Sequence, residues 1–309
     1  MLDEMAHAGP EHLDPGFVAG FDRKQGYPDP AADLAVLREH GIGPASTVVD
    51  LGAGTGQFAL AAAPLVGRVV AVDISPAMLA APTGRAATAG LANIEWVQAG
   101  FLSYQHADQP ADAVFTRNAL HQLPDFWKAL ALHRIGRMLR PGGVLRLRDL
   151  IFDFQPADTE AVLDGWLDSA AEDPALGYTR DDFAEHLRTE FSTFRWLLEP
   201  MLTAAGFNIV TTDFDGPVYG AYTCVKPHCC TAITRRDQGS APHRARITAA
   251  MLGDVVRELA ADAEPERSLC AGRRRMGCGG GREGLFGDRP LLRSVWRVLR
   301  ARLPGVHRL

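Results

Sequence analysis

Residues 48–56 read Val-Val-Asp-Leu-Gly-Ala-Gly-Thr-Gly. The apolar residues predict a buried strand over residues 47–51, and the alternating glycines predict a tight loop over residues 52–56. Glycine adopts positive φ and lets a ligand approach the bare backbone. A helix is expected over residues 57–65, and its free N–H groups and positive dipole end suit an anion. This strand, loop and helix therefore predict a binding site for a ligand with an anionic group.

Asp73 supplies the second feature of the predicted site. It follows a Val-rich strand expected over residues 68–72, where an acid is placed to accept both hydroxyls of a ribose. A dinucleotide and S-adenosylmethionine both fit this pair of features. The dinucleotide pattern expects a glycine where Gln57 stands, and Asp50 would repel a pyrophosphate but attract an ammonium group. These residues favour S-adenosylmethionine.

The rest of the body alternates between strand and helix patterns, which is typical of an α/β fold with a mainly parallel sheet. Further features are expected in chain order: a helix over 31–40, a helix from 76 that Pro82 kinks or breaks, strands over 94–98 and 111–116, a helix over 126–139, a strand over 144–150 after a Pro-Gly-Gly turn, a mostly helical segment over 151–205 interrupted at Pro200, and a hairpin formed by 207–213 and 219–225.

Residues 47–150 resemble the class I S-adenosylmethionine-dependent methyltransferases. Four motifs carry the resemblance: the glycine loop of residues 49–56, the acid Asp73, residues 117–125 (Arg-Asn-Ala-Leu-His-Gln-Leu-Pro-Asp) and residues 139–143 (Leu-Arg-Pro-Gly-Gly). The resemblance extends over about residues 31–226. It implies a Rossmann-like, doubly wound α/β fold with a seven-stranded sheet of order 3-2-1-4-5-7-6 and a helical cap.

The chain is expected to have three parts, and the resemblance implies a set of donor-binding residues. Residues 1–30 are expected to be a lid, residues 31–227 the methyltransferase domain with its helical insertion over 151–205, and residues 228–309 an appended segment. The expected donor-binding residues are Asp50, Gly52, Ala53, Gly54, Gly56, Asp73, Ile74, Phe101 and Asn118. Asp50 would hold the donor ammonium, the loop its carboxylate and Asp73 its ribose.

One position departs from the family pattern. The family often carries an acid after the third strand that holds the adenine amino group, and Gly100 stands there in this chain. Adenine would then depend on backbone groups and on packing against Phe101.

The candidate general base is His121, the histidine expected near the methyl donor; orienting the loop is the alternative role. Asp149 ends the fifth strand and either touches the substrate or forms an ion pair. Arg146 and Arg148 share one face of that strand, where they reach an anionic acceptor or pair with an acid of a covering helix. Arg117 is a surface cation or a partner of Asp50 or Asp149. His186 and Glu190, four residues apart, are expected on a solvated helix face.

Charge divides the chain into two parts. Residues 1–227 carry 16 basic and 29 acidic residues, whereas residues 228–309 carry 16 arginines and 8 acidic residues. The acidic body does not favour nucleic acid, but the basic segment leaves RNA as an alternative. That segment is expected to be poorly ordered. No C-x-x-C spacing indicates a zinc site, so no metal is predicted. No apolar run of transmembrane length occurs, and a cytoplasmic protein is expected because the acidic N-terminus lacks a signal core.

The expected function is methyl transfer from S-adenosylmethionine to an O, N or C nucleophile on a small molecule. The alternatives are an NAD(P)-dependent oxidoreductase, a non-catalytic nucleoside-binding protein and an RNA methyltransferase that uses the basic segment. The oligomeric state does not follow from these patterns.

Overall fold

The computed structural model of the 309-residue chain describes residues 2–107 and 109–228. The expectation of a poorly ordered Arg-rich segment therefore lies outside the described residues, apart from His228. Within the described ranges, no helix has the length and apolar character needed to cross a lipid bilayer.

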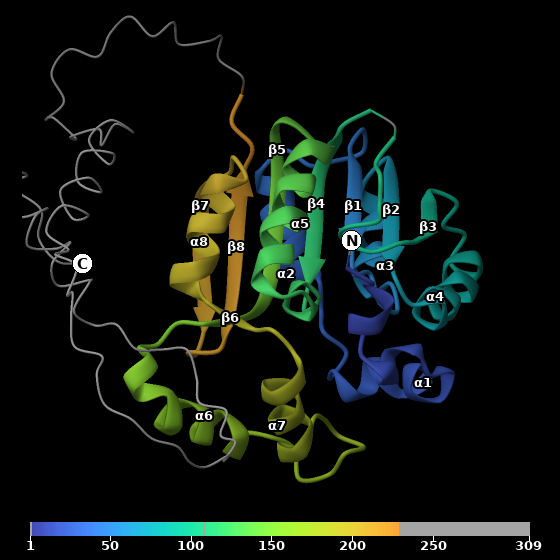
Figure 1. Ribbon diagram of the computed structural model, residues 1–309. Helices are drawn as coiled ribbons and strands as arrows, with labels where there is room; N and C mark the ends of the chain where they lie inside the picture. The colour runs from blue at the N-terminus through green and yellow to red at the C-terminus, as the bar shows by residue number, and fades with distance from the viewer. Residues whose placement is uncertain (1, 108, 229–309) are drawn as a thin grey trace, which may run out of the picture. The chain divides into compact units, whose positions relative to one another are not determined.

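The described strands form one twisted sheet with the order β3-β2-β1-β4-β5-β8-β7 (Figure 1). The strands are β1 (Thr47–Leu51), β2 (Arg68–Asp73), β3 (Ile94–Gln98), β4 (Ala111–Arg117), β5 (Leu139–Phe152), β6 (Thr193–Phe194), β7 (Asn208–Asp215) and β8 (Tyr219–Val225). Strands β1 to β5 run parallel, and β8 pairs antiparallel with both β5 and β7. The predicted order is confirmed, with the two-residue strand β6 added beside the end of β5.

Helices cover both faces of the sheet. They are α1 (Pro15–Lys24), α2 (Ala31–Glu39), α3 (Gln57–Ala62), α4 (Pro76–Thr88), α5 (Asp125–Met138), α6 (Thr159–Asp168), α7 (Arg180–Thr189) and α8 (Arg195–Ala204). Short 3-10 turns join them: η1 (Met5–His7), η2 (Pro10–Leu13), η3 (Ala63–Leu65), η4 (Leu120–Gln122) and η5 (Pro156–Asp158).

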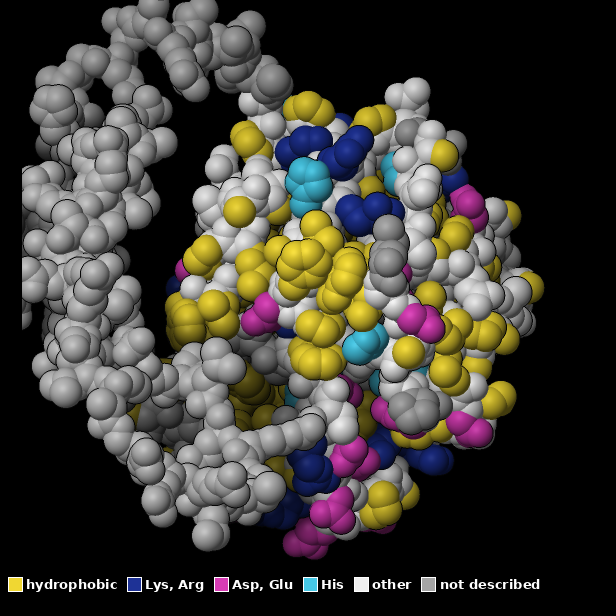
Figure 2. All heavy atoms as spheres, in the orientation of Figure 1, with side chains coloured by type: hydrophobic (Ala, Val, Ile, Leu, Met, Phe, Trp, Pro, Cys, Tyr) yellow, Lys and Arg dark blue, Asp and Glu magenta, His cyan; other side chains and the backbone are white. Residues whose placement is uncertain are grey.

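The alternation of side chains along each strand builds a core on either face. On one face, Val49 and Leu51 of β1 pack with Leu132 of α5 and Leu198 of α8. On the other face, Val48 packs with residues of α2 and α3. Figure 2 shows the outer side of the α5 layer, where hydrophobic side chains gather and where Phe126 and Leu130 are exposed. The central strands are thus buried on both sides, as parallel strands usually are.

Helices α1, α6 and α7 lie beyond the carboxyl ends of the parallel strands, below the sheet in Figure 1. A small apolar core joins α6 and α7 to the end of β5. In it, Trp166 stacks on Phe183 with ring centroids 4.3 Å apart and shares a buried cluster with Phe152 and Val218. This edge of the sheet is where open α/β folds bind their ligands.

Three local expectations are wrong. Helix α4 continues through Pro82, whose ring is buried beside the glycine loop. Strand β5 begins at Leu139 and includes the expected Pro-Gly-Gly turn, because Leu139 pairs with Ala111 before a register shift. The long helix expected to break at Pro200 is instead interrupted at residues 190–194, and α8 runs through Pro200.

Candidate active site

The glycine loop turns sharply after β1. Gly52, Gly54 and Gly56 all have positive φ, of 73°, 53° and 72°. A Cβ atom on Gly52 would lie 2.3 Å from the Cβ atom of Ala119, so this position has no room for a side chain. The backbone N–H groups of Gly52 and Ala53 donate to the carbonyl oxygen of Val72, at 2.9 and 3.0 Å. The loop is thereby fixed to the end of β2.

Asp73 ends β2 and holds the loop from the other side. Its Oδ2 accepts from the Gly54 N–H at 2.7 Å, and its Oδ1 accepts from the Ser75 N–H at 2.8 Å. Burial raises the pKa of Asp73, although these backbone donors oppose the shift. The carboxylate is therefore fixed in orientation at the site predicted to accept a ribose.

Asp50 is 2% exposed, and its Oδ2 has no hydrogen-bond partner among the described residues. Burial first, and the negative charge of Asp73 second, raise the pKa of Asp50 to about 8. A buried carboxylate oxygen without a donor is costly unless a ligand supplies one. Asp50 therefore needs a cationic or hydrogen-donating partner at this place.

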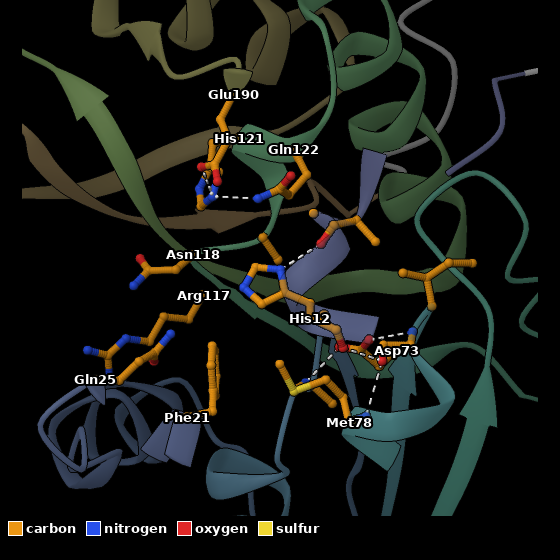
Figure 3. A pocket seen from close by; sticks show the side chains of 18 of the residues that line it. His12, Phe21, Gln25, Asp73, Met78, Arg117, Asn118, His121, Gln122 and Glu190 are labelled. Atoms are coloured by element: carbon orange, nitrogen blue, oxygen red, sulfur yellow. Dashed lines mark hydrogen bonds and ion pairs between the residues drawn. The ribbon is translucent and has the colours of Figure 1, made fainter. Parts of the chain in front are cut away.

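A cavity of about 590 Å³ connects these residues with the helical cap. Figure 3 shows Asp73 and Met78 at one end of it and His121, Gln122 and Glu190 at the other, with Arg117 and Asn118 along one side. The lining includes almost all the predicted site residues: Asp50, Gly52, Ala53, Gly54, Asp73, Ile74, Phe101, Asn118 and His121. Gly56 is not among the lining residues, and a Cβ atom there would meet Pro82 at 2.8 Å; its part in donor binding stays a prediction.

The N-terminal segment supplies residues that the sequence interpretation missed. Glu4 is 8% exposed, and its carboxylate accepts from Leu102 N–H and from Ser103 Oγ, both at 2.9 Å. A Cβ atom on Gly100 would lie 2.3 Å from Glu4 Oε1. The carboxylate of Glu4 thus occupies the space that an acidic side chain at position 100 would fill.

Helix α1 closes one side of the cavity. Its Asp22 accepts from Thr55 Oγ1 in the glycine loop and from Arg85 of α4. Its Lys24 donates to Asp182 of α7 at 2.8 Å. Phe17 and Phe21 line the cavity, and His12 packs edge-on against both rings. The N-terminal segment is therefore tied to the donor loop, to α4 and to the cap.

His121 lies in η4, directly after β4, and both of its ring nitrogens face carboxylates. Its Nδ1 is 2.5 Å from Asp149 Oδ1, and its Nε2 is 3.0 Å from Glu190 Oε2. Burial by itself would lower the pKa of His121, but the two carboxylates raise it to about 10. In this arrangement neither nitrogen is free to accept a proton from a substrate, and the role of His121 as a base stays a prediction.

The expectation of a solvated face for His186 and Glu190 is wrong. Their side chains are only 12% and 17% exposed, and His186 Nδ1 makes a close ion pair with Glu190 Oε2. The N–H of Phe191 donates to the carbonyl oxygen of His121 at 2.8 Å, which brings Glu190 to the end of β4. His121 is therefore not the sole histidine near the donor site, since His7, His12 and His186 also line the cavity.

Arg146 and Arg148 of β5 pair with a covering helix. Asp33 of α2 is fully buried, and it accepts from Arg146 at 2.8 Å and from Arg148 at 3.1 Å. Asp149 carries the ion pair with His121 instead. Arg117 lines the cavity without a carboxylate at ion-pair distance in the described part of the chain, and burial together with the nearby Arg148 lowers its pKa. A pairing of Arg117 with Asp50 or Asp149 is therefore not found.

Asn118 is one of two non-glycine residues with positive φ in the described ranges, at 48°. Asparagine tolerates this left-handed conformation better than most residues. Its N–H donates to the carbonyl oxygen of Arg148 at 2.9 Å, which holds the turn after β4 against β5. The turn delivers Asn118 to the middle of the cavity wall.

Comparison with known proteins agrees with this geometry. Residues 48–143 match a family model described as a methyltransferase domain. The strand order, the glycine loop and the acid after β2 agree with this match, so residues 48–143 are similar to a methyltransferase domain. The matched residues run from β1 to the start of β5 and so include the whole donor end of the cavity.

Individual relatives are about 30% identical and match only part of the chain. An uncharacterized protein of Mycobacterium tuberculosis is 32% identical over 105 residues, which are 34% of this chain and 37% of that protein. The uncharacterized methyltransferase YcgJ of Bacillus subtilis is 30% identical over 140 residues, 45% of this chain and 46% of that protein. The chain thus spans less than half the length of these relatives.

One solved structure extends the likeness of fold. Magnesium protoporphyrin IX methyltransferase from Synechocystis, with bound S-adenosylhomocysteine, has a TM-score of 0.52 at 14% identity. The similarity covers 72% of this chain and 100% of that one. At this identity the comparison concerns the fold alone.

Proposed function

We propose that the chain transfers a methyl group from S-adenosylmethionine to a small-molecule acceptor bound in the cavity beneath the cap. The observation that carries this proposal is the buried, unpartnered carboxylate oxygen of Asp50, beside a glycine loop and a second fixed carboxylate, Asp73. A ligand that fits needs a cationic group, an anionic group and a diol within reach of one another. A pyrophosphate brings no cation to Asp50, which opposes a dinucleotide.

Each donor group has an assigned partner in the chain. Asp50 receives the ammonium group, the loop containing Gly52 and Gly54 receives the carboxylate, and Asp73 receives the ribose hydroxyls. Ala53, Ile74, Phe101 and Asn118 complete the walls. When bound, the donor supplies an electrophilic methyl group on a sulfonium. The residues of the chain then position the acceptor, and such positioning can supply much of the rate.

Adenine binding is assigned to the N-terminal segment. We assign to Glu4 the part that an acid after the third strand plays elsewhere in the family, because its carboxylate fills the space beside Gly100. Its contacts with Leu102 and Ser103 hold it in place and leave lone pairs for an exocyclic amino group. The segment over residues 1–30 would then act as a lid that contributes a binding residue.

The acceptor end of the cavity has an aromatic wall and a cation that has no carboxylate partner among the described residues. Trp166, Tyr178, Phe183 and Tyr219 line it, and Arg117 faces the same space. The total volume of about 590 Å³ lies within the usual range for small-molecule sites. Because donor and acceptor must share it, the acceptor is a small molecule with an apolar part and an anionic group.

The test is incubation of the purified chain with methyl-labelled S-adenosylmethionine and a fractionated metabolite extract. The proposal expects label in one low-molecular-mass, anionic fraction, and loss of that label in Asp73→Ala. Label in RNA alone would contradict the small-molecule acceptor. Binding of S-adenosylhomocysteine without any labelled product would indicate a nucleoside-binding protein that does not transfer methyl groups.

A further inference from the structure

The cap end of the cavity contains a histidine–carboxylate cluster that donor binding does not use. It consists of His121 of η4, His186 of α7 and Glu190, the residue that ends α7. One ligand atom from each residue, His121 Nε2, His186 Nδ1 and Glu190 Oε2, lies within 4.8 Å of the other two. All three residues line the cavity, so the cluster faces the space assigned to the acceptor.

Both histidines are anchored through the nitrogen that points away from the cluster. His121 Nδ1 contacts Asp149 Oδ1 at 2.5 Å, and His186 Nε2 contacts Ser192 Oγ at 2.7 Å. Metal-bound histidines characteristically use their second nitrogen in this way, which fixes the tautomer and the ring orientation. The two rings meet edge to face, with centroids 5.1 Å apart. Each ring offers a nitrogen within 4.8 Å of a ligand atom of the other two residues, and Gln122 Nε2 lies 3.2 Å from His121 Nε2.

The carboxylate of Glu190 is poorly satisfied. Glu190 Oε2 is buried and near both histidines, but neither contact has hydrogen-bond alignment in the described part of the chain. A buried carboxylate oxygen without a hydrogen bond, between two anchored imidazoles, is available to bind a cation.

We propose that His121, His186 and Glu190 bind one divalent first-row transition metal ion at the acceptor end of the cavity. Two imidazoles and one carboxylate suit Zn²⁺, Fe²⁺, Co²⁺ or Mn²⁺, and three protein ligands leave coordination positions open. An acceptor hydroxyl or carboxylate could take such a position. Metal binding itself does not depend on the proposed function; its use in holding and deprotonating the methyl acceptor does.

Such an ion would also explain why His121 lies between two carboxylates. With the metal on Nε2, Asp149 remains on Nδ1, and Glu190 becomes a ligand rather than an ion-pair partner. A metal-bound acceptor hydroxyl loses its proton more easily than a free one, and that proton would pass to solvent water before the oxygen attacks the methyl group. The acceptor would then need no lone pair from His121, which is not free in any case. His121 would act as a metal ligand and Asp149 as the residue that positions it.

The test uses the full chain, stripped with a chelator and titrated with Co²⁺, whose visible absorption reports ligand geometry. The matched variants are Glu190→Gln, which keeps shape and removes charge, His186→Ala, and His133→Ala as a control, since His133 is an exposed histidine of α5. One equivalent of Co²⁺ is expected to bind the unmodified chain and the control alike. Affinity should fall at least ~10-fold in the other two variants, because a ligand is lost.

Two further measurements keep the result decisive. X-ray absorption of the Zn²⁺-loaded unmodified chain should show two imidazoles and oxygen as ligands. Sulfur ligands would overturn the proposal. Equal Co²⁺ affinity in all four proteins, or no Co²⁺ binding to the unmodified chain, would also overturn it. S-adenosylhomocysteine affinity, measured on the same samples, should be unchanged in Glu190→Gln. If the unmodified chain binds S-adenosylhomocysteine but no Co²⁺, the metal site is wrong and the proposed function stands. If it does not bind S-adenosylhomocysteine, the proposed function is wrong.

Discussion

Asp50 and Asp73 are two carboxylates at neighbouring strand ends, and their surroundings differ. Backbone N–H groups bind both oxygens of Asp73, whereas Asp50 keeps one oxygen without a partner in the described residues. A fold gains nothing from such an oxygen, since an unmet buried acceptor costs stability. Its presence is explained by a ligand that supplies the missing donor, and Asp50 is therefore where stability and binding oppose each other.

The exchange Asp50→Asn tests this opposition. The pKa of Asp50 is raised from 3.8 to about 8 in the folded chain. Between these values Asp50 is ionised in the unfolded chain but stays protonated in the folded one, so the free energy of unfolding falls as pH rises toward 8. The variant should therefore gain melting temperature over the unmodified protein, by ~2 °C or more at pH 8, if the effect exceeds about 1 kcal/mol. The gain should shrink toward pH 4. Calorimetry across pH 4–9 measures it, and a gain that does not grow with pH would contradict the account.

The same exchange should weaken binding. Removing the charge that faces the donor ammonium is expected to lower the affinity for S-adenosylhomocysteine about tenfold or more, which corresponds to ~1.4 kcal/mol. Isothermal titration measures the change. An unchanged affinity would show that the ammonium lies elsewhere.

Alanine substitutions at two glycines are expected to change the stability of the fold in opposite directions. Gly52→Ala should destabilise the fold by ~1–3 kcal/mol and abolish donor binding, because φ is positive there and Ala119 occupies the space. Gly84→Ala, inside the exposed part of α4 with no atom within 4 Å of a new Cβ, should stabilise by ~0.5–1 kcal/mol. Urea unfolding of both variants measures these changes. Destabilisation by both would show that the loss at Gly52 is not specific to the loop.

At the scale of elements, the donor half was predictable and the cap was not. Residues 48–56 and Asp73 are close in sequence to the strands that present them, so local patterns place them correctly. Glu190 and Glu4 reach the cavity through long-range contacts instead, from α7 to η4 and from the N-terminus to the segment after β3. A spacing of four residues for His186 and Glu190 predicts a shared helix face, but not which neighbour that face meets.

The N-terminal segment can be tested by moving its carboxylate. Glu4→Ala should reduce donor affinity about tenfold or more, because one charge-assisted hydrogen bond to adenine contributes ~1.5–3 kcal/mol. Gly100→Asp alone should also reduce it, since the new side chain meets Glu4. The double variant should recover affinity because one carboxylate then remains in that space. Additive losses in the double variant would refute the exchange of roles.

At the scale of the whole molecule, every residue assigned to donor, acceptor or metal lies between Glu4 and Tyr219. Removal of residues 229–309 is therefore expected to leave the affinity for S-adenosylhomocysteine within about twofold of the full chain. If the shortened chain loses binding to RNA without losing donor affinity, the basic segment serves a second purpose. A large loss of donor affinity would mean that the segment contributes to the site.

The most direct test of the central claim is isothermal titration of the full chain with S-adenosylhomocysteine, beside NADH and an Asp73→Ala variant of unchanged melting temperature. The account predicts one binding site for S-adenosylhomocysteine, no heat with NADH, and loss of binding in the variant. No binding of S-adenosylhomocysteine, or equal binding in the variant, would contradict the assignment of this cavity to a methyl donor.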